Sequence, residues 1–214
     1  MTERRTLVLA SSNPGKLEEL RTLLAALPFR VISVREALGE ALAVEETGDT
    51  FEANAILKAR AVYLATGELS LADDSGLEVD GLEGRPGVLS ARFAHPHATD
   101  AENNAALLRE LGEKGNVSRR ARFRCVLAWV APGTPEPRWV QGTCEGAIAS
   151  LPRGTGGFGY DPLFIVDGAG GRSFAELTAA EKHALSHRGK AVRALVEELA
   201  TSGARGRSDR PAGV

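Results

Sequence analysis

The stretch Leu71-Ala-Asp-Asp-Ser-Gly-Leu-Glu-Val-Asp-Gly-Leu-Glu-Gly-Arg-Pro-Gly87 is the part of the sequence that decides how this chain is organised. An apolar run enters it as a strand and ends in two adjacent carboxylates, Asp73 and Asp74. The pair Ser75-Gly76 then predicts a turn, and the alternation of apolar and acidic residues over 77–80 predicts a second short strand.

Two neighbouring carboxylates at a strand end repel each other unless a cation or a shared proton relieves them. Mg²⁺ is the usual cation, because it prefers oxygen ligands and is held by one or two carboxylates plus substrate phosphates. The alternative is a plain surface turn, since Asp, Ser and Gly are common turn residues. This stretch alone leaves both interpretations open.

A second pattern with a chemical meaning lies near the N-terminus. The apolar run 6–10 predicts a buried strand, which leads into Ser11-Ser-Asn-Pro-Gly-Lys16, and leucines at helical spacing then predict a helix that Pro28 ends. A strand, a short glycine-containing loop and a helix start can present backbone N–H groups to a phosphate. Lys16 lies where the helix dipole disfavours a cation, which points to an anionic ligand. A simple strand-to-helix connector is the alternative.

A helix is predicted to begin at Asp49, which forms a capping-box pattern with the glutamate three residues later. Asn54 and Lys58 share one face of that helix, because they lie four residues apart. Glu45 and Glu46 precede the cap. They either favour the helix N-terminus electrostatically or supply a second carboxylate for the metal.

The second half of the chain predicts a β-hairpin and two more capped helices. A capping box at Thr99 opens one helix, and a box at Thr178 opens another, with a break near His187-Arg188 because a glycine follows. Alternation predicts a long strand over 119–130, whose arginines indicate a solvated end rather than a phosphate patch, and a turn over 131–137 leads to a returning strand over 138–148. Shorter strands are predicted over 29–34 and 163–166.

The densest glycine cluster is Gly154-Thr-Gly-Gly-Phe-Gly-Tyr-Asp-Pro162, a composition that excludes a helix or a central strand. Phe158 and Tyr160 have little local cover, so an aromatic side chain here could stack on a nucleobase, a contact of about 1–3 kcal/mol. The alternative is a mobile loop whose aromatics are tucked into the core. The donor-rich stretch 182–188 suits a ligand that carries carbonyl or phosphate oxygens.

Composition limits the remaining possibilities. With 214 residues, 43% of them hydrophobic and 25% charged, the chain suits one large domain or two lobes that share a sheet. A net charge of −2 gives no overall field that would recruit nucleic acid or an anionic membrane. Cys125 and Cys144 imply no disulfide framework and indicate a reducing compartment. No stretch reaches membrane-spanning or signal-peptide length, and 201–214 predicts a disordered tail.

Several motifs, taken together, resemble one family. They are Ser11-Ser-Asn-Pro-Gly-Lys16, Glu46-Thr-Gly-Asp-Thr-Phe-Glu-Ala-Asn-Ala-Ile-Leu-Lys-Ala-Arg60, Ala72-Asp-Asp-Ser-Gly-Leu77, Gly156-Gly-Phe-Gly-Tyr-Asp-Pro162, Glu176-Leu-Thr178, Glu181-Lys182 and Ser186-His-Arg188. Their order and spacing over residues 6–199 are similar to the inosine triphosphate pyrophosphatase family, the Ham1-like or RdgB-like non-canonical purine nucleoside triphosphate pyrophosphatases. One departure is Ser11-Ser12, where many members have Thr-Gly.

The resemblance implies an α/β fold in which an elongated mixed β-sheet is flanked by helices, with two lobes around a central nucleotide-binding cleft. It implies one domain over residues 1–200, a homodimer and a cytoplasmic location, with neither nucleic acid nor a membrane as partner. The implied activity is Mg²⁺-dependent hydrolysis of ITP, dITP and XTP to the monophosphate and pyrophosphate, which cleanses the nucleotide pool.

Carried over residue by residue, the resemblance makes Asp74 the proton acceptor and a metal ligand, and Glu46 the second metal carboxylate. The residues implied to contact the nucleotide, chiefly its phosphates, are Ser11, Ser12, Asn13, Pro14, Gly15, Lys16 and Ser75. Those implied to line the base and sugar side are Phe158, Gly159, Tyr160, Asp161, Lys182, His187 and Arg188.

Two other functions stay in view. One is a phosphatase that forms an aspartyl phosphate on Asp73 or Asp74, although the usual acid-x-acid spacing is absent. The other is a nucleotide sensor without catalysis, which has no need of a paired acid and a metal.

Overall fold

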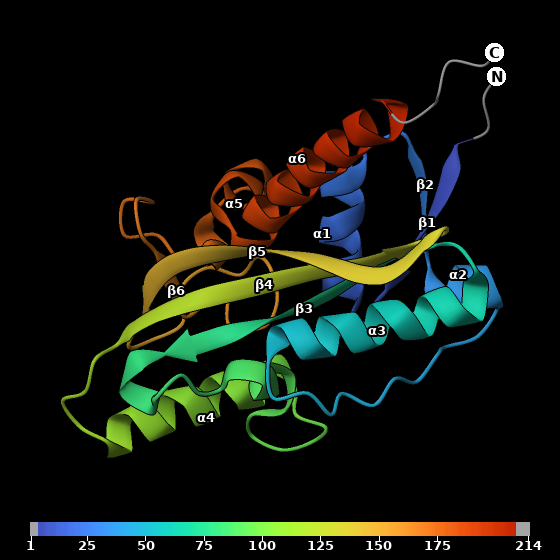
Figure 1. Ribbon diagram of the computed structural model, residues 1–214. Coiled ribbons are helices and arrows are strands. Elements are labelled where there is room, and N and C mark those ends of the chain that lie inside the picture. The colour runs from blue at the N-terminus through green and yellow to red at the C-terminus, as the bar shows by residue number, and fades with distance from the viewer. Residues whose placement is uncertain (1–3, 209–214) are drawn as a thin grey trace, which may run out of the picture.

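The computed structural model describes residues 4–208. A six-stranded sheet runs through the molecule, and helices cover both of its faces (Figure 1). The strands are β1 (Arg5–Ala10), β2 (Phe29–Ser33), β3 (Leu69–Val79), β4 (Arg120–Ala131), β5 (Thr134–Ile148) and β6 (Phe164–Val166). The helices are α1 (Pro14–Leu24), α2 (Val34–Leu38), α3 (Phe51–Thr66), α4 (Asp100–Glu113), α5 (Ala179–Leu185) and α6 (His187–Ser208), with 3₁₀ turns η1 (Asp80–Leu82), η2 (Gly87–Arg92) and η3 (Phe174–Glu176).

The sheet is mixed, and its strand order is β2-β1-β3-β4-β5-β6. β1 pairs in parallel with β2 and with β3, whereas each pair from β3 to β6 is antiparallel. The parallel part contains the N-terminal strand, loop and helix, because parallel neighbours need a crossover connection. This long mixed sheet with helices on both faces confirms the predicted α/β fold.

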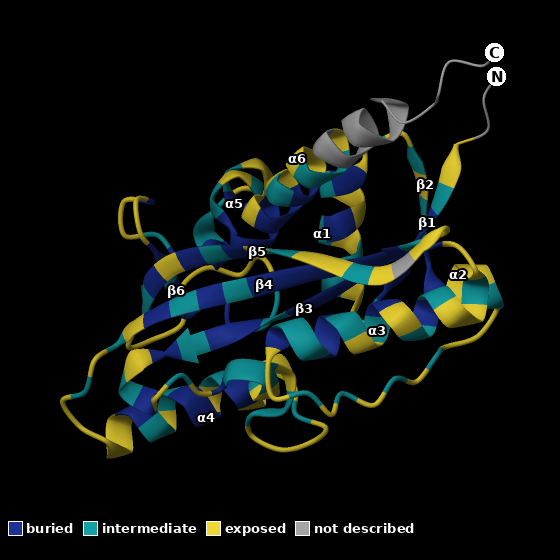
Figure 2. Ribbon diagram, in the orientation of Figure 1, coloured by how far each residue is buried: buried dark blue, intermediate teal, exposed yellow. Residues whose placement is uncertain are grey.

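Each strand sends alternate side chains to opposite faces, so the core has one part on each face of the sheet. A third part lies at one end of the sheet. The α1 and α6 side of the sheet buries Leu9, Leu20, Leu71, Leu127 and Leu195. The α3 side buries Val8, Ala55, Ala72, Val126 and Ala128. A third cluster joins α4 and η3 to the far end of the hairpin through Leu77, Leu107, Phe123, Phe164 and Phe174. Figure 2 shows β3 and β4 as the most continuously buried strands.

β3 is one unbroken strand, so the predicted turn at Ser75-Gly76 is wrong. The antiparallel register with β4 continues through both residues. Glycine is needed at position 76 for another reason: a Cβ there would lie 2.4 Å from Ser90 Oγ and 2.5 Å from the Gly87 carbonyl oxygen. Gly76 therefore lets η2 pack against the strand, which places Ser90 beside it.

Two local predictions need smaller corrections. The cap of α3 is Thr50, whose hydroxyl accepts from the Ala53 N–H at 3.1 Å, so the predicted start at Asp49 is one residue early. The predicted hairpin turn is shorter than 131–137, because β5 already begins at Thr134. Pro137 is tolerated inside β5 because β6 pairs only with its last residues, Gly146 to Ile148.

The other predicted helix signals are confirmed. Thr99 and Thr178 each form a capping box with the glutamate three residues later. The last helix breaks at Ser186, which has an extended backbone between α5 and α6. The tail expected from residue 201 falls partly on the last turns of α6 and partly on 209–214, which lie outside the described residues. Within the described part of the chain, no helix combines the length and apolar character that a membrane span requires.

Candidate active site

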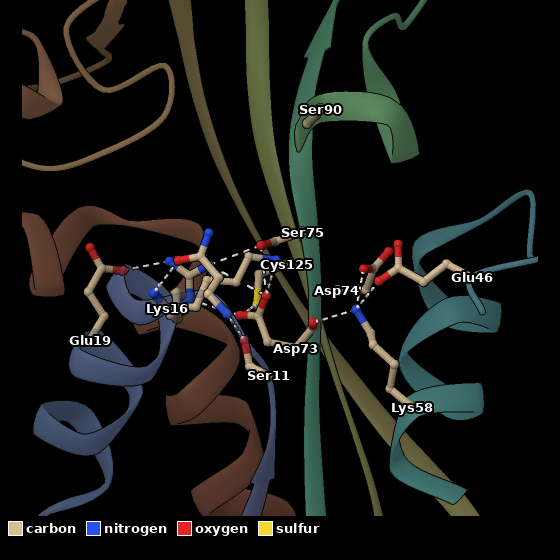
Figure 3. A network of polar contacts seen from close by, with 12 residues as sticks. Ser11, Lys16, Glu19, Glu46, Lys58, Asp73, Asp74, Ser75, Ser90 and Cys125 are labelled. Carbon is tan, nitrogen blue, oxygen red and sulfur yellow. Dashed lines mark hydrogen bonds and ion pairs between the residues drawn. The ribbon is translucent and has the colours of Figure 1, made fainter. Parts of the chain in front are cut away.

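β3 separates the two aspartates, since neighbouring residues of a strand face opposite ways. Figure 3 shows Asp73 directed towards Lys16 of α1 and Asp74 directed towards Glu46 and Lys58 of α3. The expectation that these two carboxylates share one cation is therefore wrong. Each carboxylate has a lysine of its own, and the two faces of the strand carry different chemistry.

Asp73 is completely enclosed by donors. Lys16 Nζ lies 2.9 Å from Oδ1, Arg188 Nε donates to Oδ2 at 2.8 Å, and the Ser75 hydroxyl donates to Oδ1 at 2.8 Å. The Cys125 thiol lies 3.2 Å from Oδ2. Burial by itself raises the pKa of Asp73, but the Arg188 and Lys16 charges hold that pKa well below its usual range. Asp73 is thus a fixed anion that positions Lys16 and Arg188.

Asp74 and Glu46 face each other around one ammonium group. Lys58 Nζ lies 2.5 Å from Asp74 Oδ1, 3.0 Å from Glu46 Oε1 and 2.9 Å from the Asp73 carbonyl oxygen. Burial raises the pKa of Asp74 even though Lys58 opposes the shift. Burial also acts on Glu46, but there the Lys58 charge outweighs it and lowers the pKa. Asp74 is therefore the more basic of the two carboxylates.

The loop that carries Glu46 is fixed by Asn54. The Gly48 N–H donates to Asn54 Oδ1 at 2.8 Å, and Asn54 Nδ2 donates to the Gly48 carbonyl at 3.1 Å. One face of α3 therefore holds the loop through Asn54 and the carboxylates through Lys58, which explains why these residues lie four apart. Of the two glutamates left open by the sequence, Glu45 is exposed and Glu46 faces Asp74.

The oxygen atoms around the Lys58 ammonium are of the kind that bind a hard divalent cation. Two carboxylates and a carbonyl oxygen converge on one positive charge, and these are the ligand types that Mg²⁺ takes. Within residues 4–208, no three His, Cys, Asp or Glu side chains converge as a complete metal site. Asp74 and Glu46 would hold the ion, and substrate phosphates and water would complete its coordination, as is usual for Mg²⁺.

The N-terminal loop forms an anion-accepting helix start. Asn13 caps α1 by accepting from the Lys16 N–H at 3.0 Å, and the Ser11 hydroxyl accepts from the Asn13 N–H at 3.2 Å. Pro14 begins the helix, and α1 has no acidic residue in its first turn. The Lys16 charge also lowers the pKa of Asp74 and of Glu46. The charge at this helix start therefore acts on both carboxylates, although its ion pair is with Asp73.

A second cluster of charges lies on the Asp73 side of the sheet. Lys182 Nζ contacts Asp161 Oδ2 at 2.5 Å and Glu19 Oε1 at 2.6 Å, and it lies 4.9 Å from the centre of the Phe158 ring. Glu19 also pairs with Arg188 at 2.5 Å. The Phe158 ring faces Gly15, where a Cβ would come within 2.7 Å of it. Glycine at position 15 thus allows the aromatic loop to meet the N-terminal loop.

His187 is a buried neutral imidazole. Its ring stacks on Phe123 with centroids 4.7 Å apart and planes 10° apart. Burial holds the pKa of His187 well below its usual value, and the Arg188 charge lowers it further. The buried Nδ1 atom has no hydrogen-bond partner within residues 4–208. A ligand with a hydrogen-bonding edge would satisfy this atom.

The two aromatic rings of the loop differ: one lies at the cavity, where it could stack on a base, and the other is tucked into the core. Phe158 is half-buried at the cavity, whereas Tyr160 is tucked into the core and its hydroxyl donates to the Ser90 carbonyl at 2.9 Å. Asp161 accepts from the Phe158 N–H at 2.9 Å and so shapes the loop. Burial raises the pKa of Asp161, while Lys182 opposes the shift.

One cavity of about 630 Å³, open mouth included, collects most of the predicted residues. Those that line it are Asn13, Lys16, Ser75, Phe158, Gly159, Tyr160, Asp161, Lys182, His187 and Arg188. Ser11 and Ser12 of the adjoining loop and Pro14 and Gly15 of the first turn of α1 do not line the cavity, and Asp74 and Glu46 lie on the opposite face of β3. Lys16 lines the cavity, and its charge also lowers the pKa of both carboxylates.

Comparison with known proteins agrees with this arrangement. A sequence model of the Ham1 family matches residues 7–198. The chain belongs to the Ham1 family. It is similar to a protein named dITP/XTP pyrophosphatase from Nitratidesulfovibrio vulgaris, with 52% identity over 91% of this chain and 95% of that protein. It is similar to a protein of the same name from an Anaeromyxobacter species, with 45% identity over 92% of this chain and 99% of that protein.

Solved structures of Ham1 proteins share the fold. The Ham1 protein of Coxiella burnetii gives a TM-score of 0.82 at 43% identity, over 92% of this chain and 99% of that one. A nucleoside-triphosphatase, also named dITP/XTP pyrophosphatase, from Mycobacterium abscessus gives 0.71 at 45% identity, over 89% and 98%. The match to the Ham1 family confirms the resemblance drawn from the motifs.

Sequence reasoning missed several residues of this Ham1-family site. The helical spacing puts Lys58 on the same face as Asn54 and gives it no role in the site, although a lysine beside a predicted acidic centre is a usable signal. Glu19 lies three residues after Lys16 on α1, and this helical spacing is a signal that puts Glu19 on the same face as Lys16. Ser90 and Phe123 line the cavity through tertiary packing, for which no local pattern exists.

Proposed function

We propose that this chain is a Mg²⁺-dependent nucleoside-triphosphate pyrophosphatase that hydrolyses dITP, XTP and ITP to the monophosphate and pyrophosphate. Such an activity removes non-canonical purines from the nucleotide pool. The observation that carries the proposal is the pairing of Asp74 and Glu46 around the half-buried Lys58 ammonium, next in the strand to Asp73, which pairs with Lys16 at the start of α1. The dITP/XTP pyrophosphatase name of the relatives supports the choice of substrate.

The phosphates fit between the α1 N-terminus and the carboxylate pair. The helix dipole favours an anion at the start of α1, and Lys16 adds a full positive charge there. When bound by Asp74 and Glu46, Mg²⁺ would supply further charge neutralisation to the triphosphate. Asp73, held on the other face, keeps Lys16 in place.

Asp74 is suited to accept a proton from water. Its carboxylate is desolvated and its pKa is raised, which makes it a stronger base than a solvent-exposed aspartate. In the proposed reaction, Asp74 orients and deprotonates the water whose oxygen attacks the α-phosphorus. The bond from the α-phosphorus to the bridging oxygen breaks, and pyrophosphate leaves.

Base selection follows from the donors at the cavity. Lys182 and Arg188 can donate to a 6-oxo group, whereas the 6-amino group of adenine would leave buried donors facing a donor. Guanine shares the 6-oxo group, so its exclusion must involve its 2-amino group. Phe158 offers a ring on which a purine can stack.

Pyrophosphate release from XTP, dITP, ITP, GTP and ATP with Mg²⁺ tests the proposal. We expect rapid release from the first three, little from GTP and ATP, and none after chelation of the metal. Release of orthophosphate instead would favour the aspartyl-phosphate alternative. That route would also form an acyl phosphate on the protein that hydroxylamine can trap during a single turnover, whereas direct attack by water forms no covalent intermediate. Tight nucleotide binding without any release would indicate a sensor.

The remaining features implied by family membership belong to the same proposal. We expect a homodimer, which sedimentation at micromolar concentration measures directly. We also expect the protein to act in the cytoplasm, where its nucleotide substrates are formed. The two free thiols, Cys125 and Cys144, are both buried and unpaired with each other, which is compatible with a reducing compartment.

A further inference from the structure

The tip of the aromatic loop is held by a helix from elsewhere in the chain. The Gly159 N–H donates to Asp100 Oδ2 at 2.6 Å, and Asn104 Nδ2 donates to the Gly159 carbonyl at 2.9 Å. Both partners lie in the first turns of α4, more than fifty residues earlier in the sequence. α4 therefore binds both the N–H and the carbonyl group of Gly159, the residue next to Phe158.

Beside the tip, the Tyr160 hydroxyl donates to the Ser90 carbonyl of η2 at 2.9 Å, and further anchors lie at the base of the loop. The Gly156 N–H donates to the Ala175 carbonyl at 3.1 Å, and the Ala175 N–H donates to the Asp161 carbonyl at 3.3 Å. Asp161 also accepts from the Phe158 N–H, which closes the loop on itself. Gly159 has a φ of 60°, in the left-handed region. The two hydrogen bonds to α4 are the ones made by the backbone of Gly159 itself, whereas Tyr160 ties the loop to η2 through its side chain.

Asp100 is free to make this contact because other residues cap α4. Thr99 and Glu102 form the capping box, so the Asp100 carboxylate is not needed for the helix N–H groups. As the first residue of α4, Asp100 is favoured as an anion by the helix dipole. A short hydrogen bond to an ionised acceptor is about twice as strong as a neutral one. The loop tip is held by this solvent-exposed contact together with the one from Asn104.

The contact has a consequence for the neighbouring ring. Asp100, Gly159 and Phe158 line the same cavity, and the Phe158 ring lies close to Gly15 and to the Lys182 ammonium. We propose that Asp100, assisted by Asn104, is a positioning residue that sets the Phe158 ring for stacking on the nucleobase. Through Asp100, α4 determines the affinity for the nucleobase without touching the reacting phosphates. The inference rests on the proposed function.

Two substitutions at one position separate positioning from stability. Asp100→Ala removes the acceptor for the Gly159 N–H, whereas Asp100→Asn keeps an oxygen acceptor; both remove the charge at the start of α4. We expect Asp100→Ala to raise KM for XTP and dITP about ten-fold, with kcat changed less than about two-fold. Asp100→Asn is expected to restore most of the affinity, although both variants lose the same helix-dipole contribution in urea unfolding.

Binding of inosine monophosphate, followed by titration calorimetry, provides a second readout that does not need catalysis. We expect Asp100→Ala to weaken it by the same factor as KM. If Asp100→Ala fails to fold, Asn104→Leu removes the other contact to Gly159 at similar volume, and we expect it to raise KM with kcat retained.

Several outcomes would overturn the inference. They are an unchanged KM in Asp100→Ala, equal losses in Asp100→Ala and Asp100→Asn, or a loss confined to ribonucleotides. The last result would mean that Asp100 contacts the sugar 2′-hydroxyl directly. Wild-type protein in the same assay keeps the two proposals apart, since absence of pyrophosphate release there would refute the enzyme function whatever the variants do.

Discussion

At the scale of single residues, Asp73 and Asp74 do different jobs because a strand turns them to opposite faces. Asp73 is saturated by Lys16, Arg188 and a hydroxyl, so it has no free lone pair for water or for a phosphoryl group. Asp74 has one lysine partner and a raised pKa. Asp74, which still has oxygen lone pairs free to accept a proton, is thus the carboxylate that can act as a base.

Replacing Asp74 with Asn tests that assignment. The amide keeps the size of the side chain but cannot accept a proton, so we expect turnover of XTP and dITP to fall by about 10²–10⁴-fold. Nucleotide binding should persist, because the cavity and the α1 N-terminus are unchanged. Steady-state pyrophosphate release and calorimetric titration with the monophosphate measure the two properties separately. Near-normal turnover would remove Asp74 from the mechanism.

His187 gives the fold a pH dependence of known sign. Burial keeps the folded imidazole neutral with a depressed pKa, whereas an unfolded histidine titrates near about 6.5. The stabilising contribution is therefore complete above that value. It is lost as the pH falls below it, by about 1.4 kcal/mol per pH unit, because the unfolded chain takes up a proton that the folded one does not.

Urea unfolding at pH 6.5 and 5.5 measures this effect. Wild type and His187→Gln should differ in how much stability they lose between these two values, and the variant should lose less. Groups that both proteins share, including the acids with raised pKa, cancel in the comparison. Parallel pH dependences in the two proteins would show that His187 is not held neutral by the fold.

At the scale of elements, glycines set the distances between layers. A Cβ at Gly142 of β5 would lie 2.2 Å from the His187 carbonyl oxygen and 2.4 Å from the Ala191 nitrogen, so this residue lets α6 rest directly on the sheet. That contact places His187 and Arg188 at the cavity. Packing of the last helix and assembly of the site therefore depend on the same close approach.

Gly142→Ala should lower the free energy of unfolding by about 1–3 kcal/mol, because backbone atoms cannot move aside as a flexible side chain can. Gly112 in α4 is the matched control, since a Cβ there meets nothing within 4 Å. Gly112→Ala should raise stability by about 0.5–1 kcal/mol, the usual preference for alanine in a helix. Urea melts of both variants decide, and equal effects would contradict the packing argument.

What the sequence could predict also differs between elements. The helix starts at Thr99 and Thr178 and the strand alternation of β4 depend on residues close in the chain, so local patterns found them. The continuity of β3 through Gly76 depends on η2 packing against it, which no local pattern contains. Ser and Gly favour a turn locally, and the pairing with β4 overrides that preference.

At the scale of the whole molecule, ion pairs join the two ends of the chain. Glu19 of α1 contacts Lys182 of α5 and Arg188 of α6, although more than 160 residues separate them. Burial raises the pKa of Glu19, but the Arg188 and Lys182 charges more than offset this and lower it. The N-terminal helix is thereby locked to the C-terminal helices on the Asp73 side of the sheet.

Glu19→Gln removes the charge from this junction while keeping its shape. Lys182 retains Asp161 and Arg188 retains Asp73, so we expect a loss of about 1–3 kcal/mol in the free energy of unfolding rather than the loss of the fold. Glu18→Gln is the control, because Glu18 is exposed on the same helix. A loss no larger than in the control would show that the junction does not contribute.

The site as a whole could be predicted only through the combination of motifs. Each motif supplied a residue type, and family resemblance assigned the roles, but the partition of the site by β3 required the structure. Lys58 and Glu19 were missed for the same reason: each acts on residues that become neighbours only when the sheet and its helices assemble.

The central claim is that Asp74 and Glu46 hold a divalent cation beside the triphosphate. Anomalous diffraction from crystals grown with Mn²⁺ and a non-hydrolysable dITP analogue tests it most directly. We expect a peak between the two carboxylates with the phosphates against Lys16, a peak that Glu46→Gln weakens and Glu45→Gln, at the exposed neighbour, leaves intact. No peak beside Asp74, or a triphosphate bound away from Lys16, would contradict the account.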